Sequence, residues 1–131
     1  MIKASIVKEV VVRASEEVGL LAEILAPIAE ARLSLVAINT TSFANEARIS
    51  LVAEDTSRMV DVLKKAGLAP WEGEVVAVEI ADEAGAVAEV TSKLAQNKID
   101  IRALYASTRV GADATLYLWT SDNAATVKAL V

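Results

Sequence analysis

The sequence predicts an α+β fold made of two βαββαβ units, each with an antiparallel sheet that carries its helices on one face. Three observations support this prediction. The chain repeats itself, the hydrophobic pattern changes from strand type to helix type in the same order in both copies, and the 131 residues are close to twice the repeat period.

The repeat is clearest around two glycines. Residues 16–19 (EEVG) correspond to residues 82–85 (DEAG), and Gly19 and Gly85 are 66 positions apart. The match continues through residues 21–24 and 87–90, and through residues 33–35 and 99–101. Two copies of this length fill the chain.

Each copy begins with a β-branched run, residues 10–12 or 75–78, which predicts a strand. A helix is predicted next, because apolar residues recur at spacings of three and four: Leu21, Ile24, Leu25 and Ile28 in the first copy, and Val87, Val90 and Leu94 in the second. Ser15 or Glu16, and Asp82, are the expected N-caps. Pro27 predicts a kink or a shorter helix in the first copy.

A β-hairpin is predicted after each of these helices. Its strands are residues 33–43 and 49–53 in the first copy, and residues 99–108 and 116–120 in the second. A second helix follows, with Asp55 as cap, Met59 and Leu63 on its apolar face and Gly67 as its stop. In the second copy this helix begins at Asp122.

The fourth strand differs between the copies. Residues 68–72 are the expected final strand of the first copy, whereas no equivalent follows Val131. Residues 1–14 align with residues 68–81 by the same period, so we expect residues 2–6 to fill the fourth-strand place of the second copy. The predicted domains are therefore residues 1–67 and 68–131, two ferredoxin-like α+β units that exchange strands.

Composition excludes several classes of function. The chain contains no Cys and no His, which rules out thiolate nucleophiles, imidazole bases, disulfides and the usual structural zinc sites. A net charge of −5 and five aromatic residues argue against a nucleic-acid partner. No apolar run reaches the length of a membrane span and no signal peptide opens the chain, so we expect a cytoplasmic protein without membrane contact.

High hydropathy predicts a subunit interface. Apolar residues make up 54% of the chain and the mean hydropathy is +0.43. Strand alternation places Tyr117 and Trp119 on the sheet face away from the helices, and Arg102 and Leu104 join them if their strand alternates strictly. We expect this face to form a homodimer interface. A ligand platform and an ordinary partly exposed cluster remain alternatives.

Residues 19–35 (GLLAEILAPIAEARLSL) resemble the ACT domain signature found in aspartokinases and other amino-acid-regulated enzymes. Residues 85–90 and 98–101 resemble it in the second copy, so the chain looks like a tandem ACT protein. The resemblance implies a βαββαβ fold, paired domains that form an eight-stranded sheet, and amino acids bound between domains near the first strand-to-helix turn. The family usually has a proline before the turn glycine, where this chain has Val18 and Ala84.

A strand-to-helix turn suits an amino acid for a physical reason: free N–H groups at the start of a helix attract a carboxylate. A glycine lets the backbone approach the ligand closely, and Glu16, Asp82 or Asn39 would accept hydrogen bonds from its ammonium group. The candidate ligand-binding residues are Glu16, Val18, Gly19, Leu20, Asn39, Asp82, Ala84, Gly85 and Ala86. The alternative is that each turn only connects a strand to a helix, and that its glycine and acidic residues stabilise the fold without binding a ligand.

The predicted function is amino-acid binding by a regulatory protein that is not an enzyme and uses no cofactor or metal. Because the chain has no room for a catalytic domain, regulation is expected to act through a separate protein. The alternative is a structural oligomerisation module without a ligand. An acylphosphatase would need a phosphate-cradling Arg and an Asn, and although Arg13 and Asn39 are present, the turn is acidic. An RNA-recognition module would need basic flanks.

Overall fold

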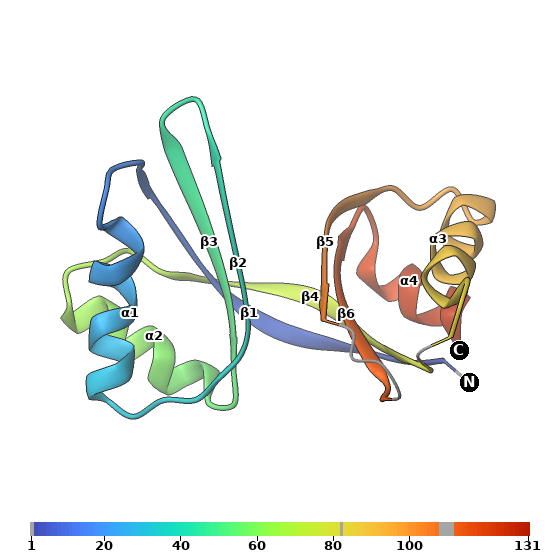
Figure 1. The fold of residues 1–131 in the computed structure, drawn as a ribbon, viewed down its shortest axis with the longest axis horizontal. Helices are drawn as coiled ribbons and strands as arrows, with labels where there is room; N and C mark the ends of the chain where they lie inside the picture. Colours follow the sequence, from blue (N-terminus) through green and yellow to red (C-terminus); the bar gives the residue numbers. More distant parts are fainter. Residues whose placement is uncertain (1, 82, 108–111) are drawn as a thin grey trace. The chain divides into compact units, whose positions relative to one another are not determined.

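The computed structural model describes residues 2–81, 83–107 and 112–131. Within them the chain alternates strands and helices in the predicted α+β order (Figure 1). The elements are β1 (Lys3–Ser15), α1 (Leu20–Glu30), β2 (Leu35–Phe43), β3 (Glu46–Ala53), α2 (Thr56–Lys65), β4 (Trp71–Ile80), α3 (Ala86–Gln96), β5 (Ile101–Ser107), β6 (Ala114–Thr120) and α4 (Asn123–Leu130). Among the described residues, no helix has the length and apolar character to cross a membrane.

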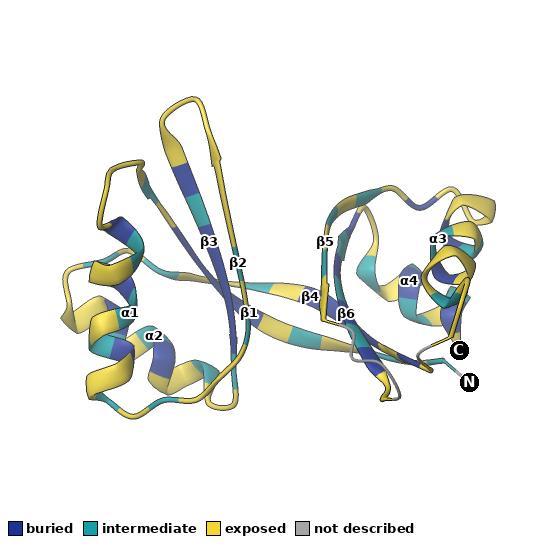
Figure 2. Ribbon diagram, viewed as in Figure 1, coloured by how far each residue is buried: buried dark blue, intermediate teal, exposed yellow. Residues whose placement is uncertain are grey.

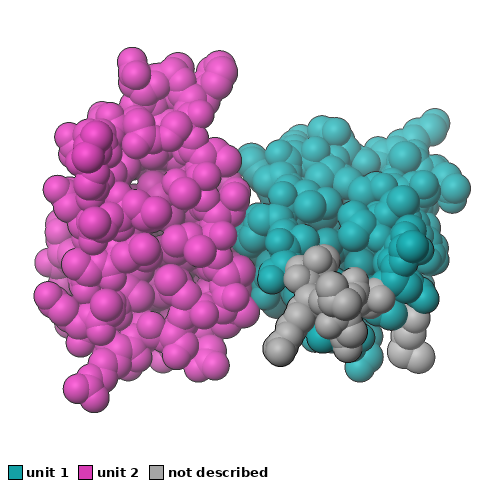
Figure 3. All heavy atoms as spheres, in the orientation of Figure 1, with its two compact units in different colours: residues 1–7, 74–131 teal, residues 8–73 magenta. Residues whose placement is uncertain are grey.

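The strands follow the order β2-β3-β1-β4-β6-β5. Antiparallel pairing joins β3 to both β1 and β2, and joins β6 to both β4 and β5. The chain divides into two compact units, residues 8–73 and residues 1–7 with 74–131 (Figure 3). Both β1 and β4 therefore contribute one part of their length to each unit.

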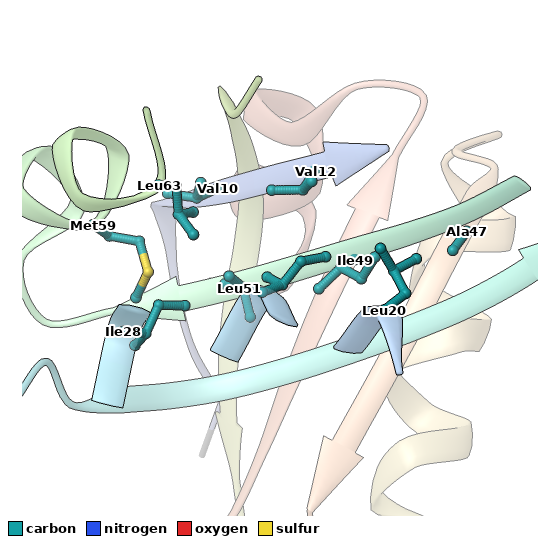
Figure 4. Packing of buried hydrophobic residues seen from close by; sticks show 10 residues of the cluster. Val10, Val12, Leu20, Ile28, Ala47, Ile49, Leu51, Met59 and Leu63 are labelled. Atoms are coloured by element: carbon teal, nitrogen blue, oxygen red, sulfur yellow. The ribbon is translucent and has the colours of Figure 1, made fainter. Parts of the chain in front are cut away.

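In the unit of residues 8–73, helices α1 and α2 cover one face of the strands. Alternation along the strands explains the packing, because every second residue of β1 and β3 points to the helices. The buried core consists of Val10, Val12, Leu20, Ile24, Ile28, Ala47, Ile49, Leu51, Met59 and Leu63 (Figure 4). Figure 2 shows this burial on the inner sides of α1 and α2.

Helix α1 contains Pro27 in its interior and still runs for 11 residues, the same length as α3. The prediction of a shorter first helix is therefore wrong. Pro27 removes one backbone donor, but the helix ends three residues later at Glu30, and Ile24 and Ile28 are buried on either side of it. Packing of the apolar stripe compensates for the lost hydrogen bond.

The sheet face of this unit that points away from α1 and α2 carries a buried polar cluster that the sequence analysis missed. Glu9 is only 3% exposed, and the guanidinium of Arg48 lies 3.5 Å from its carboxylate. Arg48 also donates to Ser50 Oγ at 3.1 Å and lies over the ring of Trp71, 5.9 Å from its centroid. These contacts compensate for burying the carboxylate.

In the unit of residues 1–7 and 74–131, the core forms between α3, α4 and one face of β4 and β6. Its buried members are Val76, Val78, Ile80, Val90, Leu94, Ile99, Ala114, Leu116, Leu118 and Leu130. Ile2 and Ala4, from the beginning of the chain, pack against this core. The expected separate strands over residues 68–72 and 75–78 are a single strand, β4, that starts at Trp71.

The hairpin of this unit confirms the predicted alternation of β6. Leu116 and Leu118 are buried in the core, while Tyr117 and Trp119 are half-buried on the other face. Strand β5 does not alternate strictly, because a bulge lies between Ile101 and Ala103. The bulge shifts the register and places Leu104 opposite Leu118, on the helix side, so its predicted place beside Trp119 is wrong.

Candidate functional site

Two strand-to-helix turns, between β1 and α1 and between β4 and α3, have the same backbone geometry. The N-cap residues are Gly19, with φ 90° and ψ −5°, and Gly85, with φ 84° and ψ −3°. Both lie in the left-handed region, which a glycine reaches without steric cost. Asp82, a predicted site residue in the second turn, lies outside the described residues.

Corresponding hydrogen bonds close the two turns. The amide of Leu20 donates to the carbonyl of Glu17 at 3.2 Å, and that of Ala86 donates to the carbonyl of Glu83 at 3.2 Å. The first helical bonds run from Glu23 to the carbonyl of Gly19 at 3.0 Å and, correspondingly, from Glu89 to that of Gly85 at 2.9 Å. The amides of Leu21 and Ala22 in α1, and of Val87 and Ala88 in α3, precede the first helical donor. These amides can therefore donate hydrogen bonds to an anion.

Helices α2 and α4 differ from α1 and α3 in having a side-chain N-cap. Asp55 accepts a hydrogen bond from the amide of Arg58 at 3.1 Å, and Asp122 accepts one from Ala125 at 2.9 Å. Among the residues that the structure describes, no side chain caps α1 or α3. The prediction of Ser15 or Glu16 as cap of α1 is wrong, because the helix begins after Gly19 and Ser15 still belongs to β1.

The space around both turn glycines is open. Apart from its two chain neighbours, a Cβ atom added at Gly19 or at Gly85 would meet no atom of the described residues within 4 Å. Val18 is fully exposed beside Gly19, whereas Leu20 is buried in the core. In the second turn, Ala84 is exposed and Ala86 is partly buried. A small ligand can therefore approach the backbone of either turn from solvent.

Glu16 lies at the first turn and is held there by the neighbouring hairpin. Its amide donates to the carbonyl of Asn45 at 2.7 Å, and the hydroxyl of Ser42 donates to its carboxylate. Ser42 and Asn45 are neighbours of the site that the sequence analysis missed, since only the strand register brings them there. The register was not readable from the sequence because the hairpin has no diagnostic turn motif.

Asn39 is not brought to the turn. It lies opposite Ser50 of β3, which in turn lies opposite Val11 of β1. Val11 is four residues before Ser15, so Asn39 is about 13 Å along the strands from the end of β1. Val10 and Val12 point to the helices, and Asn39 therefore shares the opposite sheet face with Val11.

A recess of about 220 Å³ lies next to the second turn, within the unit of residues 1–7 and 74–131. Its lining residues are Lys3, Glu79, Ile80, Ala81 and Asp113. Charges of both signs surround it, and Ala81 is the last residue before the turn. Among the described residues, no group of three or more acidic side chains could hold a metal ion.

The aromatic face of the same unit consists of Arg102, Tyr105, Tyr117 and Trp119. The rings of Tyr105 and Tyr117 stack with centroids 5.2 Å apart, and Arg102 lies over Trp119 at 5.8 Å. Burial, and secondly the negative charge of Glu79, raise the pKa of Tyr117 above its ordinary value. These four side chains therefore pack against one another in two pairs, one stacked and one cation–π.

Comparison with known proteins identifies the fold and its repeat. The family model described as an ACT domain pair matches residues 5–131. No curated protein sequence matches the chain.

Solved structures show the same architecture at low sequence identity. Protein BT0572 from Bacteroides thetaiotaomicron is similar with a TM-score of 0.88 at 20% identity, over 97% of this chain and 88% of that one. The ligand-free regulatory subunit of aspartate kinase from Thermus thermophilus has a TM-score of 0.68 at 10% identity, over 97% and 93%. E. coli aspartokinase III, in complex with lysine and aspartate, has a TM-score of 0.58 at 15% identity, over 98% and 31%.

Proposed function

Because the chain belongs to the family of ACT domain pairs, we propose that it is a regulatory protein that binds a small amino acid and catalyses no reaction itself. The proposed sites are the turns before α1 and α3. The observation that carries the proposal is the left-handed glycine at the start of both helices, each without a side-chain cap and with open space above its backbone. Two such turns at equivalent repeat positions favour a shared role.

The proposed binding mode uses the backbone for the carboxylate. The amides of Leu21 and Ala22 in the first turn, and of Val87 and Ala88 in the second, would donate to the ligand carboxylate, with support from the helix dipole. At the first turn, Glu16 would accept from the ligand ammonium, because the hydroxyl of Ser42 holds its carboxylate in place. Asn39 has no part in this mode, since it lies on the opposite sheet face.

Regulation would act on a separate protein. One similar structure is itself called the regulatory subunit of aspartate kinase, and this chain covers 93% of it. We therefore extend the proposal to a regulated partner protein that this chain binds non-covalently.

A thermal-shift screen of the twenty amino acids tests the proposed ligand class. A ligand that binds only the folded protein stabilises it by about 2.7 kcal/mol at a hundred times its dissociation constant. We expect at least one small amino acid to raise the melting temperature. If none does so at millimolar concentration, the ligand-free structural module takes the place of this proposal. The hydrogen bonds from Leu20 to Glu17 and from Ala86 to Glu83, which close both turns without a ligand, favour that second candidate.

The location of the site is tested by replacing its glycines. Gly19→Val and Gly85→Val put a branched side chain into the open space where the ligand would lie, and should remove the shift. Gly67→Val is the matched control, because Gly67 also has a positive φ, 85°, with nothing within 4 Å, and lies after α2, away from the turns. A shift that survives both turn substitutions would place the ligand elsewhere.

A further inference from the structure

The two units contain equivalent strand pairs with matching registers. In the pairing of β1 with β3, Ala14 lies opposite Ala47. In the pairing of β4 with β6, Ile80 lies opposite Ala114. The second pair of residues follows the first by 66 and 67 positions, which is the repeat period on either side of the hairpin loops. The ends of the two strand pairs can therefore be compared residue by residue.

The charges at this end of the strands differ between the units. In the unit of residues 8–73, Arg13 and Glu46 form an ion pair, and Arg13 Nε donates to Glu46 Oε1 at 2.7 Å. The equivalent residues of the other unit are Glu79 and Asp113. Two carboxylates thus stand where the first unit has a guanidinium and a carboxylate, and the cation that Arg13 supplies is missing.

The recess of about 220 Å³ lies at this place, and Lys3, Glu79 and Asp113 are its charged lining residues. Lys3 and Glu79 point to the sheet face away from α3 and α4, because their chain neighbours pack against the core. Within the described part of the chain, no ion pair or side-chain hydrogen bond holds any of these three side chains. All three are exposed, so a ligand can reach them from solvent.

We propose that this recess binds a small molecule that carries a guanidinium group at one end and a carboxylate at the other. The guanidinium lies against Glu79 and Asp113, as that of Arg13 lies against Glu46 in the other unit, and the carboxylate meets the ammonium of Lys3. The proposal does not depend on amino-acid binding at the turns, because no helix amide takes part in it.

Size and charge favour a ligand of this class. The recess is smaller than the pockets of roughly 300–1,000 Å³ that hold drug-sized ligands, so it suits a molecule of about the size of an amino acid. One ammonium and two carboxylates leave an excess of one negative charge, which arginine, with one excess positive charge, neutralises. A divalent metal ion is a poorer occupant, because Lys3 repels it and the described lining offers it two carboxylates.

Titration calorimetry of the full chain with arginine, citrulline and agmatine tests the proposal. Citrulline has a neutral urea group in place of the guanidinium, so it should bind at least about tenfold more weakly than arginine. Citrulline keeps the α-ammonium and α-carboxylate groups, so equal affinity for both would mean that only these groups are recognised, and the proposal would be wrong. Agmatine lacks the carboxylate and should also bind more weakly than arginine. Lys3→Met should weaken arginine binding without weakening that of agmatine.

A charge reversal in the recess provides the sharpest variant. Glu79→Arg supplies the missing cation from the chain itself, as Arg13 does in the other unit, and should abolish arginine binding. An unchanged or higher melting temperature shows that this variant folds. Arg13→Gln is the matched control, because it breaks the equivalent ion pair in the other unit and should leave arginine binding unchanged. Arginine binding that survives Glu79→Arg, or a wild-type protein that binds no arginine at millimolar concentration, overturns the proposal.

Discussion

At Tyr117 the fold changes the chemistry of a side chain. The residue stacks on Tyr105 and is half-buried, and burial and then the charge of Glu79 raise the pKa of its hydroxyl above the ordinary 10.0. The neutral form of Tyr117 is therefore more strongly favoured in the folded protein than in the unfolded chain. This contribution to stability is fully present below the unfolded pKa and is lost as the pH rises through the folded pKa.

Stability should consequently fall at alkaline pH in a way that depends on Tyr117. We expect the free energy of unfolding from urea denaturation to drop as the pH rises above about 10, and Tyr117→Phe to flatten this decline. Glu79→Gln removes the second cause, so it should lower the pKa of Tyr117 toward the ordinary value in a tyrosinate absorbance titration. An identical pH profile for wild type and Tyr117→Phe would contradict the argument.

At the scale of elements, the caps divide the helices into two pairs. Asp55 and Asp122 cap α2 and α4, so Asp55→Ala and Asp122→Ala should each cost about 1 kcal/mol of stability in chemical denaturation. Ser15→Ala is the control, because Ser15 lies in β1 and caps no helix, and its effect should stay within about 0.5 kcal/mol. A larger loss for Ser15→Ala than for Asp55→Ala would contradict this division.

The same elements show what a sequence can predict. Asp55 was recognised as a cap because an aspartate before an apolar stripe is typical of a helix start, and Asp122 was recognised as the start of the equivalent helix in the second copy. Gly19 was placed correctly in the turn, but not as the N-cap, since composition does not reveal the sign of φ. Leu104 and Asn39 were misplaced because a bulge and a strand register depend on tertiary pairing.

At the scale of the whole molecule, the repeat predicted the element order of both units, because a repeated hydrophobic pattern must bury equivalent faces. It did not predict that residues 71–80 form one continuous strand, since Gly73 and three acidic residues interrupt the apolar pattern. The backbone pairing that keeps β4 continuous joins strands that are far apart in the sequence, so the local strand propensity does not predict it.

The beginning of the chain provides the last prediction. Residues 1–7 belong to the compact unit of residues 74–131, where Ile2 and Ala4 pack against the core that contains Leu116. Deleting residues 1–6 should destabilise that unit by about 1 kcal/mol or more, because full burial of an isoleucine contributes about 1.5–3 kcal/mol and Ile2 is partly buried. Amide exchange in β6 should become faster, while β3, in the other unit, should keep its protection.

Point variants distinguish two causes of the destabilisation: the loss of core packing by Ile2, and the shortening of the chain at its N-terminus. Ile2→Ala should reproduce part of the loss, whereas Ser5→Ala, at an exposed position of β1, should leave stability within about 0.5 kcal/mol. If the truncated protein melts like the full chain and exchange around Leu116 is unchanged, the first residues do not complete the unit. Faster exchange in β6 alone would instead show that a strand from the start of the chain stabilises a core built from its second half.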